Sequence, residues 1–361
     1  MKKISLIGLG NVGATVAYTL IERQLCDTLA LFDKKEGLAQ AEVNDLSDAT
    51  VKRDGNIKLI AGKTNDLDDS DIIIFAPGDI SILQKHSDRL EEFKYTKACV
   101  EEWAPVIKNS DFDGIIVSVT NPCDIIAEYI QKLTEMPCEK VIGTGTILDT
   151  ARMKNALAKF IDLDPNSIDG YVIGEHGNSQ FVAWSNVYIA NEPITNFLDE
   201  KTLEDIEEST RMKAFETVKA KGYTSYGIAN ATAIIVETIF KDAKTILSVS
   251  SYSPVESCYI GHPAVVGRNG IIREFHLKLD EKEQAKWDHS VKTIKETTPI
   301  RALALAKAPQ KLGSQGGFFF YAIFPFFLSL FELMIAADAS PVIFSTSCTL
   351  CYPYILHTVF Y

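Results

Sequence analysis

Short apolar runs alternate with amphipathic stretches through the first part of the chain. Residues 3–7 read KISLI and end at a group of glycines, and a helical pattern of apolar positions follows from Val12 to Ile21. Further strand-length apolar runs lie near residues 29–33, 57–61, 71–76, 114–119 and 140–143, with helical patterns near 36–49, 89–109 and 125–133. Apolar strands separated by helices predict a parallel sheet that is covered on both faces. The pattern therefore predicts a doubly wound α/β domain over residues 1–145.

The second half of the chain has a different pattern. It predicts helices near residues 149–160, 200–221, 224–242 and 281–297, and strands near 169–174, 181–190, 246–251, 257–267 and 270–276. Successive short strands with helices packed on them are typical of antiparallel sheets. We therefore expect an α+β substrate domain over residues 146–311.

The composition changes again after Lys311. Nine of the 19 phenylalanines lie beyond residue 317. The apolar stretch 317–337 is long enough to cross a bilayer, but Pro325 lies inside it and Glu332 would be placed in hydrocarbon. Residues 312–361 are interpreted as an atypical aromatic tail that is not part of the fold, and a membrane anchor and a shifted reading frame both stay open as explanations.

Composition and charge narrow the class of protein. The chain has 361 residues, 46% of them hydrophobic, and a net charge of −12, which argues for a globular protein and against a nucleic-acid partner. Its seven cysteines are scattered and odd in number, which favours reduced thiols in the cytoplasm over a disulfide framework. Cys348 and Cys351 have a CxxC spacing, but no second pair and no histidine cluster completes a metal site, so we expect no metal.

The glycine cluster fits a dinucleotide-binding fingerprint. GLGNVG at residues 8–13 follows a predicted strand and opens a predicted helix, and Asp33 ends the next strand 20 residues beyond Gly13. In this Rossmann arrangement Gly8 permits the turn, Gly10 lets the backbone approach a pyrophosphate and Gly13 allows close packing of the helix. Asp33 can accept hydrogen bonds from ribose hydroxyls and would repel a 2′-phosphate, which favours NAD over NADP. The alternative is a surface aspartate that caps the turn.

A second set of residues has the chemistry of an acid–base site. His176 lies in the segment GEHGN, where the glycines are expected to keep its ring accessible. Asp149 and Arg152 lie three residues apart on one face of a predicted helix. They form either a local ion pair, or a site in which Asp149 orients His176 while Arg152 binds a substrate carboxylate as a bidentate fork. The sequence leaves both readings open.

From residue 2 to about 297 the chain resembles the L-lactate/malate dehydrogenase family and, within it, is most similar to the L-2-hydroxyisocaproate dehydrogenases. The resemblance is carried by GLGNVG (8–13), Asp33, TNPCD (120–124), GTGTILDTARM (143–153), GEHGNSQFVAWS (174–185) and KGYTSYG (221–227). It implies an NAD-dependent oxidoreductase that transfers a hydride between NAD(H) and a small 2-oxo or L-2-hydroxy acid, working as a homodimer or homotetramer.

The resemblance also implies roles for particular residues. His176 matches the acid–base histidine, Asp149 its orienting partner, and Arg89 a mobile-loop arginine that polarises the carbonyl. The implied substrate-binding residues are Arg152, Asn121 and Thr224. The implied cofactor-binding residues are Gly8, Gly10, Asn11, Val12, Gly13, Asp33, Gly78, Val119, Asn121 and Ile228.

Departures from the family pattern bear on the substrate. The loop between Gly78 and Arg89 is longer than in lactate dehydrogenases and has no second arginine for the distal carboxylate of malate. Its apolar residues Ile80, Ile82 and Leu83 either line a larger pocket, which favours a branched 2-oxo acid such as 2-oxoisocaproate, or anchor the loop.

Three alternatives remain. Two are enzymes, an L-lactate dehydrogenase and, less favoured, a malate dehydrogenase. The third is an NAD-binding protein without catalysis, anchored by its tail.

The resemblance also bears on activation by a sugar phosphate. Lys154 and Asp169 occupy the positions at which sugar-phosphate-activated relatives have arginine and histidine, and an acid there would repel phosphate.

Overall fold

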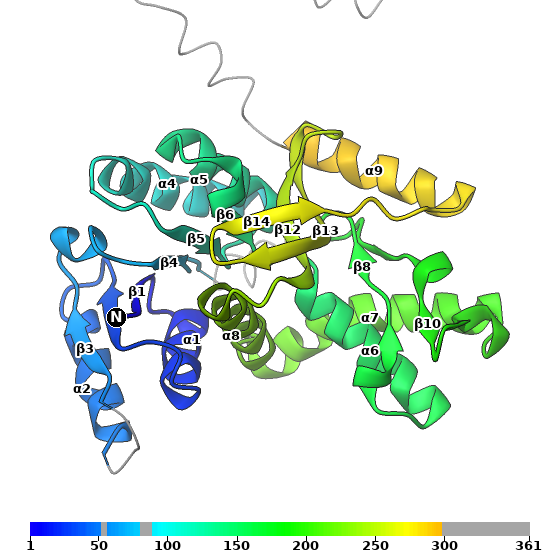
Figure 1. The fold of residues 1–361 in the computed structure, drawn as a ribbon, viewed down its shortest axis with the longest axis horizontal. Helices are drawn as coiled ribbons and strands as arrows, with labels where there is room; N and C mark the ends of the chain where they lie inside the picture. Colours follow the sequence, from blue (N-terminus) through cyan, green and yellow to red (C-terminus); the bar gives the residue numbers. More distant parts are fainter. Residues whose placement is uncertain (52–55, 80–88, 298–361) are drawn as a thin grey trace, which may run out of the picture. The chain divides into compact units, whose positions relative to one another are not determined.

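A nine-stranded sheet forms the centre of the fold (Figure 1). The computed structural model describes residues 1–51, 56–79 and 89–297, apart from the side chains of residues 89–91 and 214–215. The strands are β1 (Lys3–Ile7), β2 (Thr28–Phe32), β3 (Lys58–Ala61), β4 (Ile72–Phe75), β5 (Ile115–Ser118), β6 (Val141–Gly143), β12 (Thr245–Ser253), β13 (Cys258–Gly267) and β14 (Gly270–Glu274). The order is β14-β13-β12-β6-β5-β4-β1-β2-β3, and β1 to β6 pair in parallel. The predicted doubly wound parallel sheet is confirmed.

Helices cover both faces of the parallel strands. The first face carries α1 (Asn11–Glu22), α2 (Leu38–Ala49) and α8 (Tyr226–Lys241), and the second carries α4 (Arg89–Lys108) and α5 (Cys123–Thr134) (Figure 1). On α1 the buried positions Val16, Ala17, Leu20 and Ile21 recur with the helical period, and they join side chains of β1, β4 and α8 in one apolar cluster. This burial holds α1, and the glycine turn before it, against the sheet.

The strands predicted near residues 169–174 and 181–190 are each broken. The elements of this part are α6 (Ile147–Ile161), β7 (Ile168–Asp169), β8 (Val172–Ile173), β9 (Phe181–Val182), β10 (Tyr188–Ile189), β11 (Glu192–Pro193), α7 (Glu200–Lys221) and α9 (Glu281–Thr297). Gly170, with φ of +147°, interrupts the first run, and a 3-10 turn at Trp184–Asn186 interrupts the second. The Trp184 Nε1–H donates to Glu207 on α7 at 3.0 Å, so a tertiary contact overrides the local strand preference.

The antiparallel strands of the second half extend the parallel sheet. They are antiparallel as predicted, but β12 joins β6 with Ser250 opposite Gly143, so that one sheet crosses the predicted boundary at residue 145. Residues 144–146 and the first turn of α6 therefore follow β6, the strand at which the parallel part of the sheet meets the antiparallel part.

Within the described part of the chain, no helix is both long and apolar enough to span a bilayer. The predicted tail, residues 312–361, lies outside the described residues.

Candidate active site

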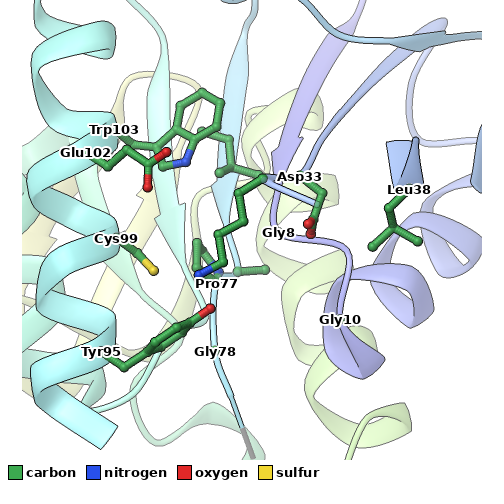
Figure 2. Close-up of a pocket in the computed structure, with 13 residues that line it drawn as sticks. Gly8, Gly10, Asp33, Leu38, Pro77, Gly78, Tyr95, Cys99, Glu102 and Trp103 are labelled. Carbon is green, nitrogen blue, oxygen red and sulfur yellow. The ribbon is translucent and has the colours of Figure 1, made fainter. Parts of the chain in front are cut away.

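A pocket opens at the carboxyl ends of β1 and β4, where the strand order reverses. It is lined by Ile7, Gly8, Gly10, Asp33, Lys34, Leu38, Ala76, Pro77, Gly78, Tyr95, Cys99, Glu102 and Trp103. Figure 2 shows the glycine turn and Asp33 on one side and the α4 residues on the other. Four residues predicted for cofactor binding, Gly8, Gly10, Asp33 and Gly78, are thereby brought together.

The glycine turn combines tight backbone packing with one open side. Gly8 has φ of +92°, and a Cβ added to Gly13 would lie 1.8 Å from the Gly8 carbonyl oxygen. A Cβ added to Gly10 would meet nothing within 4 Å. Among the described residues no side chain caps the N-terminus of α1, which leaves its first amides without a capping acceptor. The turn thus fits the pyrophosphate of a dinucleotide.

Asp33 holds the turn and lines the pocket at the same time. Its Oδ2 accepts from the Leu9 amide at 2.7 Å and its Oδ1 from the Lys35 amide at 2.8 Å. The turn-capping alternative is therefore part of the structure. Each carboxylate oxygen has a further lone pair, so these contacts are compatible with acceptance from ribose hydroxyls.

The opposite wall of the pocket was missed by the sequence analysis. Tyr95, Cys99, Glu102 and Trp103 of α4 contribute to it, and Lys34 places its Nζ 4.4 Å from the centroid of the Tyr95 ring. The hydrogen bond with Tyr95 raises the pKa of Lys34. The spacing of the four α4 residues, which puts them on one helical face, is a signal in the sequence, but only the fold shows which face meets the glycine turn.

The acid–base residues meet around one buried carboxylate. Asp149 is 1% exposed, its Oδ2 lies 2.8 Å from His176 Nδ1, and its Oδ1 accepts from Arg152 NH1 at 2.8 Å. The ion pair is present, and so is the Asp149–His176 contact of the other interpretation, because the two contacts use different oxygens. Burial alone would raise the pKa of Asp149, but the charges and hydrogen bonds of His176 and Arg152 outweigh it and lower the pKa to about 2.

The loop that carries His176 is held from two sides. Gly174, with φ of +97°, would place a Cβ 2.5 Å from Ser290 Oγ, so the glycine permits close contact with α9. Ser290 Oγ accepts from the Glu175 amide at 3.0 Å. On the other side, the His176 amide donates to Asp124 Oδ2 at 2.8 Å. Sequence reasoning assigned no role to Ser290 or Asp124.

The other predicted site residues lie on several different elements. Asn121 follows β5, is joined to Pro122 by a cis peptide bond and is exposed. Val119, Thr224 and Ile228 are half-buried, and Asn11 and Val12 form the first turn of α1. Arg89 begins α4, but its side chain lies outside the described residues, as do Ile80, Ile82 and Leu83. Among the residues that the structure describes, no group of histidine, cysteine and acidic side chains is arranged to hold a metal ion.

Comparison with known proteins gives matches along most of the chain. Residues 2–143 match the NAD binding domain of lactate/malate dehydrogenases, and residues 146–300 match their alpha/beta C-terminal domain. L-lactate dehydrogenase 1 of Bifidobacterium longum is 37% identical over 305 residues, which cover 81% of this chain and 96% of that protein. L-lactate dehydrogenase 1 of Staphylococcus aureus is 36% identical over 308 residues, covering 81% and 95%.

Solved structures give the same picture. The minor L-lactate dehydrogenase of Enterococcus mundtii in its ligands-bound form superposes with a TM-score of 0.78 at 28% identity, covering 86% of this chain and 99% of that one. A lactate dehydrogenase from a Medee basin deep-sea metagenome gives a TM-score of 0.76 at 30% identity, covering 82% and 97%.

Two alanine substitutions in the glycine turn should separate folding from cofactor binding. Gly13→Ala forces a Cβ against a backbone carbonyl and should lower the free energy of unfolding by about 3 kcal/mol. Gly10→Ala meets no protein atom, so its unfolding should be unchanged while its Kd for NADH rises at least about tenfold. Urea unfolding and NADH fluorescence titrations measure the two effects, and equal losses of stability would contradict this description of the turn.

The contribution of Asp149 to stability should depend on pH. Its folded pKa of about 2 lies below the ordinary value of 3.8, so the contribution is fully present above pH 4 and lost as the pH falls towards 2. It should amount to about 2 kcal/mol. Urea unfolding of the wild type and of Asp149→Asn between pH 6 and 2 checks this, because the difference between them should shrink below pH 4. A difference that stays constant would show that Asp149 is not held as a charged group.

Proposed function

The chain belongs to the lactate/malate dehydrogenase family and is an NAD-dependent 2-hydroxyacid dehydrogenase, and we propose that it interconverts pyruvate and L-lactate or a similar monocarboxylic pair. The observation that carries the proposal is the buried Asp149 carboxylate, which contacts His176 through one oxygen and Arg152 through the other. A histidine and an arginine on one carboxylate support a proton donor beside a cation that binds the substrate carboxylate.

The residues of the site divide the work of the reaction. Bound NADH supplies the hydride that reduces C2 of the oxo acid. Protonated His176 donates its Nε2 proton to the carbonyl oxygen and recovers a proton there during oxidation. Asp149 accepts from Nδ1–H and so fixes the tautomer that keeps Nε2 for this exchange. Arg152 binds the substrate carboxylate through further N–H groups of its guanidinium, and Arg89 polarises the carbonyl.

The residues assigned to NAD binding fall into two groups. The first-turn amides of α1, at Asn11, Val12 and Gly13, fit the pyrophosphate, and Asp33 fits the adenosine ribose. Val119, Asn121 and Ile228 are assigned to the nicotinamide end, where Thr224 lines the substrate pocket. These assignments rest on the motifs of the family together with the pocket at Asp33.

Pyruvate is placed first among the substrates because relatives that align over four-fifths of the chain are named L-lactate dehydrogenases. A branched acid is the second candidate, favoured by the apolar residues Ile80, Ile82 and Leu83 of the loop. Oxaloacetate is disfavoured because the loop sequence offers no second arginine for its distal carboxylate.

We further propose a cytoplasmic homodimer or homotetramer. The described cysteines, Cys26, Cys99, Cys123, Cys138 and Cys258, are free thiols, which suits a reducing compartment. The oligomer follows from the resemblance to the family. The non-catalytic alternative is disfavoured because His176, Asp149 and Arg152 are in contact.

Replacement of His176 by alanine should lower kcat for pyruvate reduction by about 100-fold to 10,000-fold, because proton donation is lost. NADH binding, measured by fluorescence, should be unchanged. His289→Ala is the matched control, since this histidine is exposed on α9. A kcat near the wild-type value in His176→Ala would refute the assignment.

The specificity constants for three oxo acids should rank the substrates. We expect pyruvate to have the highest kcat/KM, 2-oxoisocaproate to follow, and oxaloacetate to be reduced at least about 100-fold less efficiently because its second carboxylate lacks a partner. Steady-state kinetics with NADH measures the order. A higher value for 2-oxoisocaproate would favour the branched-acid candidate, and efficient oxaloacetate reduction would refute both.

A further inference from the structure

A second buried carboxylate contacts the catalytic histidine. Asp124 lies in the first turn of α5, is 2% exposed, and accepts from the His176 backbone amide at 2.8 Å through Oδ2. His176 is therefore bound by two carboxylates from different helices, with Asp149 at its ring and Asp124 at its backbone. The mechanism proposed above uses only the first.

Burial of the Asp124 carboxylate costs folding free energy. Among the described residues neither its Oδ1 nor the buried Ser250 hydroxyl on β12 makes a well-aligned hydrogen bond, and the Ser250 hydroxyl interacts with the Asp124 carboxyl group. Burial raises the pKa of Asp124 to about 6, although the Ser250 hydroxyl and the His176 amide act in the opposite direction. An uncharged asparagine oxygen would accept the same amide hydrogen bond without the cost of burying a charge. A role that needs the charge itself is therefore indicated.

Among the titratable groups near Asp124, the protonated ring of His176 is the one that a negative charge stabilises. Among the described residues, the titratable side chains with an electrostatic effect on or from Asp124 belong to Glu175, His176, Cys258 of β13 and Cys123 of its own helix. Of these, only His176 becomes a cation. A negative charge near an imidazole favours its protonated form, which is the proton-donating form in the reduction.

We propose that Asp124 is a positioning residue of the acid–base site, which fixes the His176 backbone through its hydrogen bond and stabilises the imidazolium through its charge. The inference rests on the proposed function of His176. It also connects the two ends of the site, because Asp124 lies three residues after Asn121 in the same motif. A shift of the α5 N-terminus would then move the nicotinamide-side loop and the histidine together.

Two substitutions separate the charge from the hydrogen bond. Asp124→Asn keeps an oxygen acceptor and removes the charge, whereas Asp124→Glu keeps the charge and displaces the acceptor by one methylene. Glu128→Gln is the matched control, because Glu128 is a buried carboxylate one turn further along α5 that pairs with Lys132 at 2.6 Å. Thermal unfolding verifies that each full-length variant is folded.

The decisive measurement is the titration of the His176 ring by NMR in the cofactor-free chain, with its signal assigned by its absence in His176→Gln. Asp124→Asn should lower the His176 pKa by about one unit and shift the alkaline limb of pyruvate reduction by the same amount. Asp124→Glu should leave the pKa near its wild-type value and lower kcat with little change in KM. Glu128→Gln should change neither the titration nor the kinetics.

An unchanged His176 titration in folded Asp124→Asn, or an equal shift in Glu128→Gln, would overturn the proposal. If Asp124→Asn does not fold, the outcome rests on Asp124→Glu, where wild-type kcat would overturn it. Failure of the proposed function is distinguishable from these results, because His176→Ala would then retain activity while the NMR shifts could still be present.

Discussion

The close approach of β6 to β12 is the constraint on which the site depends. Gly143 lies opposite Ser250, and a Cβ added to Gly143 would lie 2.8 Å from the Ser250 Cβ. A Cβ on Gly145 would lie 2.2 Å from the Ser250 nitrogen. Without side chains at these positions the chain can leave β6 and begin α6 at once, which brings Asp149 to the junction. On its other edge β12 pairs with β13. An isolated bridge between Gly261 of β13 and Gly174 fixes the start of the loop that contains His176. Two halves of the sequence therefore meet at one acid–base pair because their backbones can touch.

In the mechanism proposed above, the buried charge of Asp149 keeps at least one cationic partner throughout the reaction. Asp149 is buried, so its ionised form requires compensation at every stage. While His176 is protonated the carboxylate has two cationic partners, and after proton donation the Arg152 contact remains. The proposed mechanism gives Arg152 two carboxylates to bind, its buried neighbour Asp149 and the substrate. A guanidinium has five N–H donors in a planar fork and can do this, whereas a lysine ammonium would have to divide one point charge between them.

The sequence predicts the parts of this protein that depend on local order. The strand, glycine turn, helix and Asp33 follow one another within a short segment, and Asp149 and Arg152 are one helical turn apart, so spacing alone indicates their geometry. Other features depend on contacts between distant segments. The wall of the pocket formed by α4, the support of the catalytic loop by Ser290, and the broken strand around Trp184 each require a partner that the local pattern does not contain. Antiparallel strands were predicted, but their addition to the parallel sheet depends on the single junction of β12 with β6.

Asp33 shows why alternative readings of one residue need not exclude each other. As a turn cap, its carboxylate binds the Leu9 and Lys35 amides, which ties the glycine turn to the end of β2. These bonds also fix the orientation of its oxygens at the edge of the pocket. A carboxylate already held by two amides loses little conformational entropy when it accepts a ribose hydroxyl, because its rotamer is set before binding. The structural contact would thus supply the preorganisation for the ribose recognition that we propose for Asp33, and removal of the side chain would disturb the turn and that recognition together.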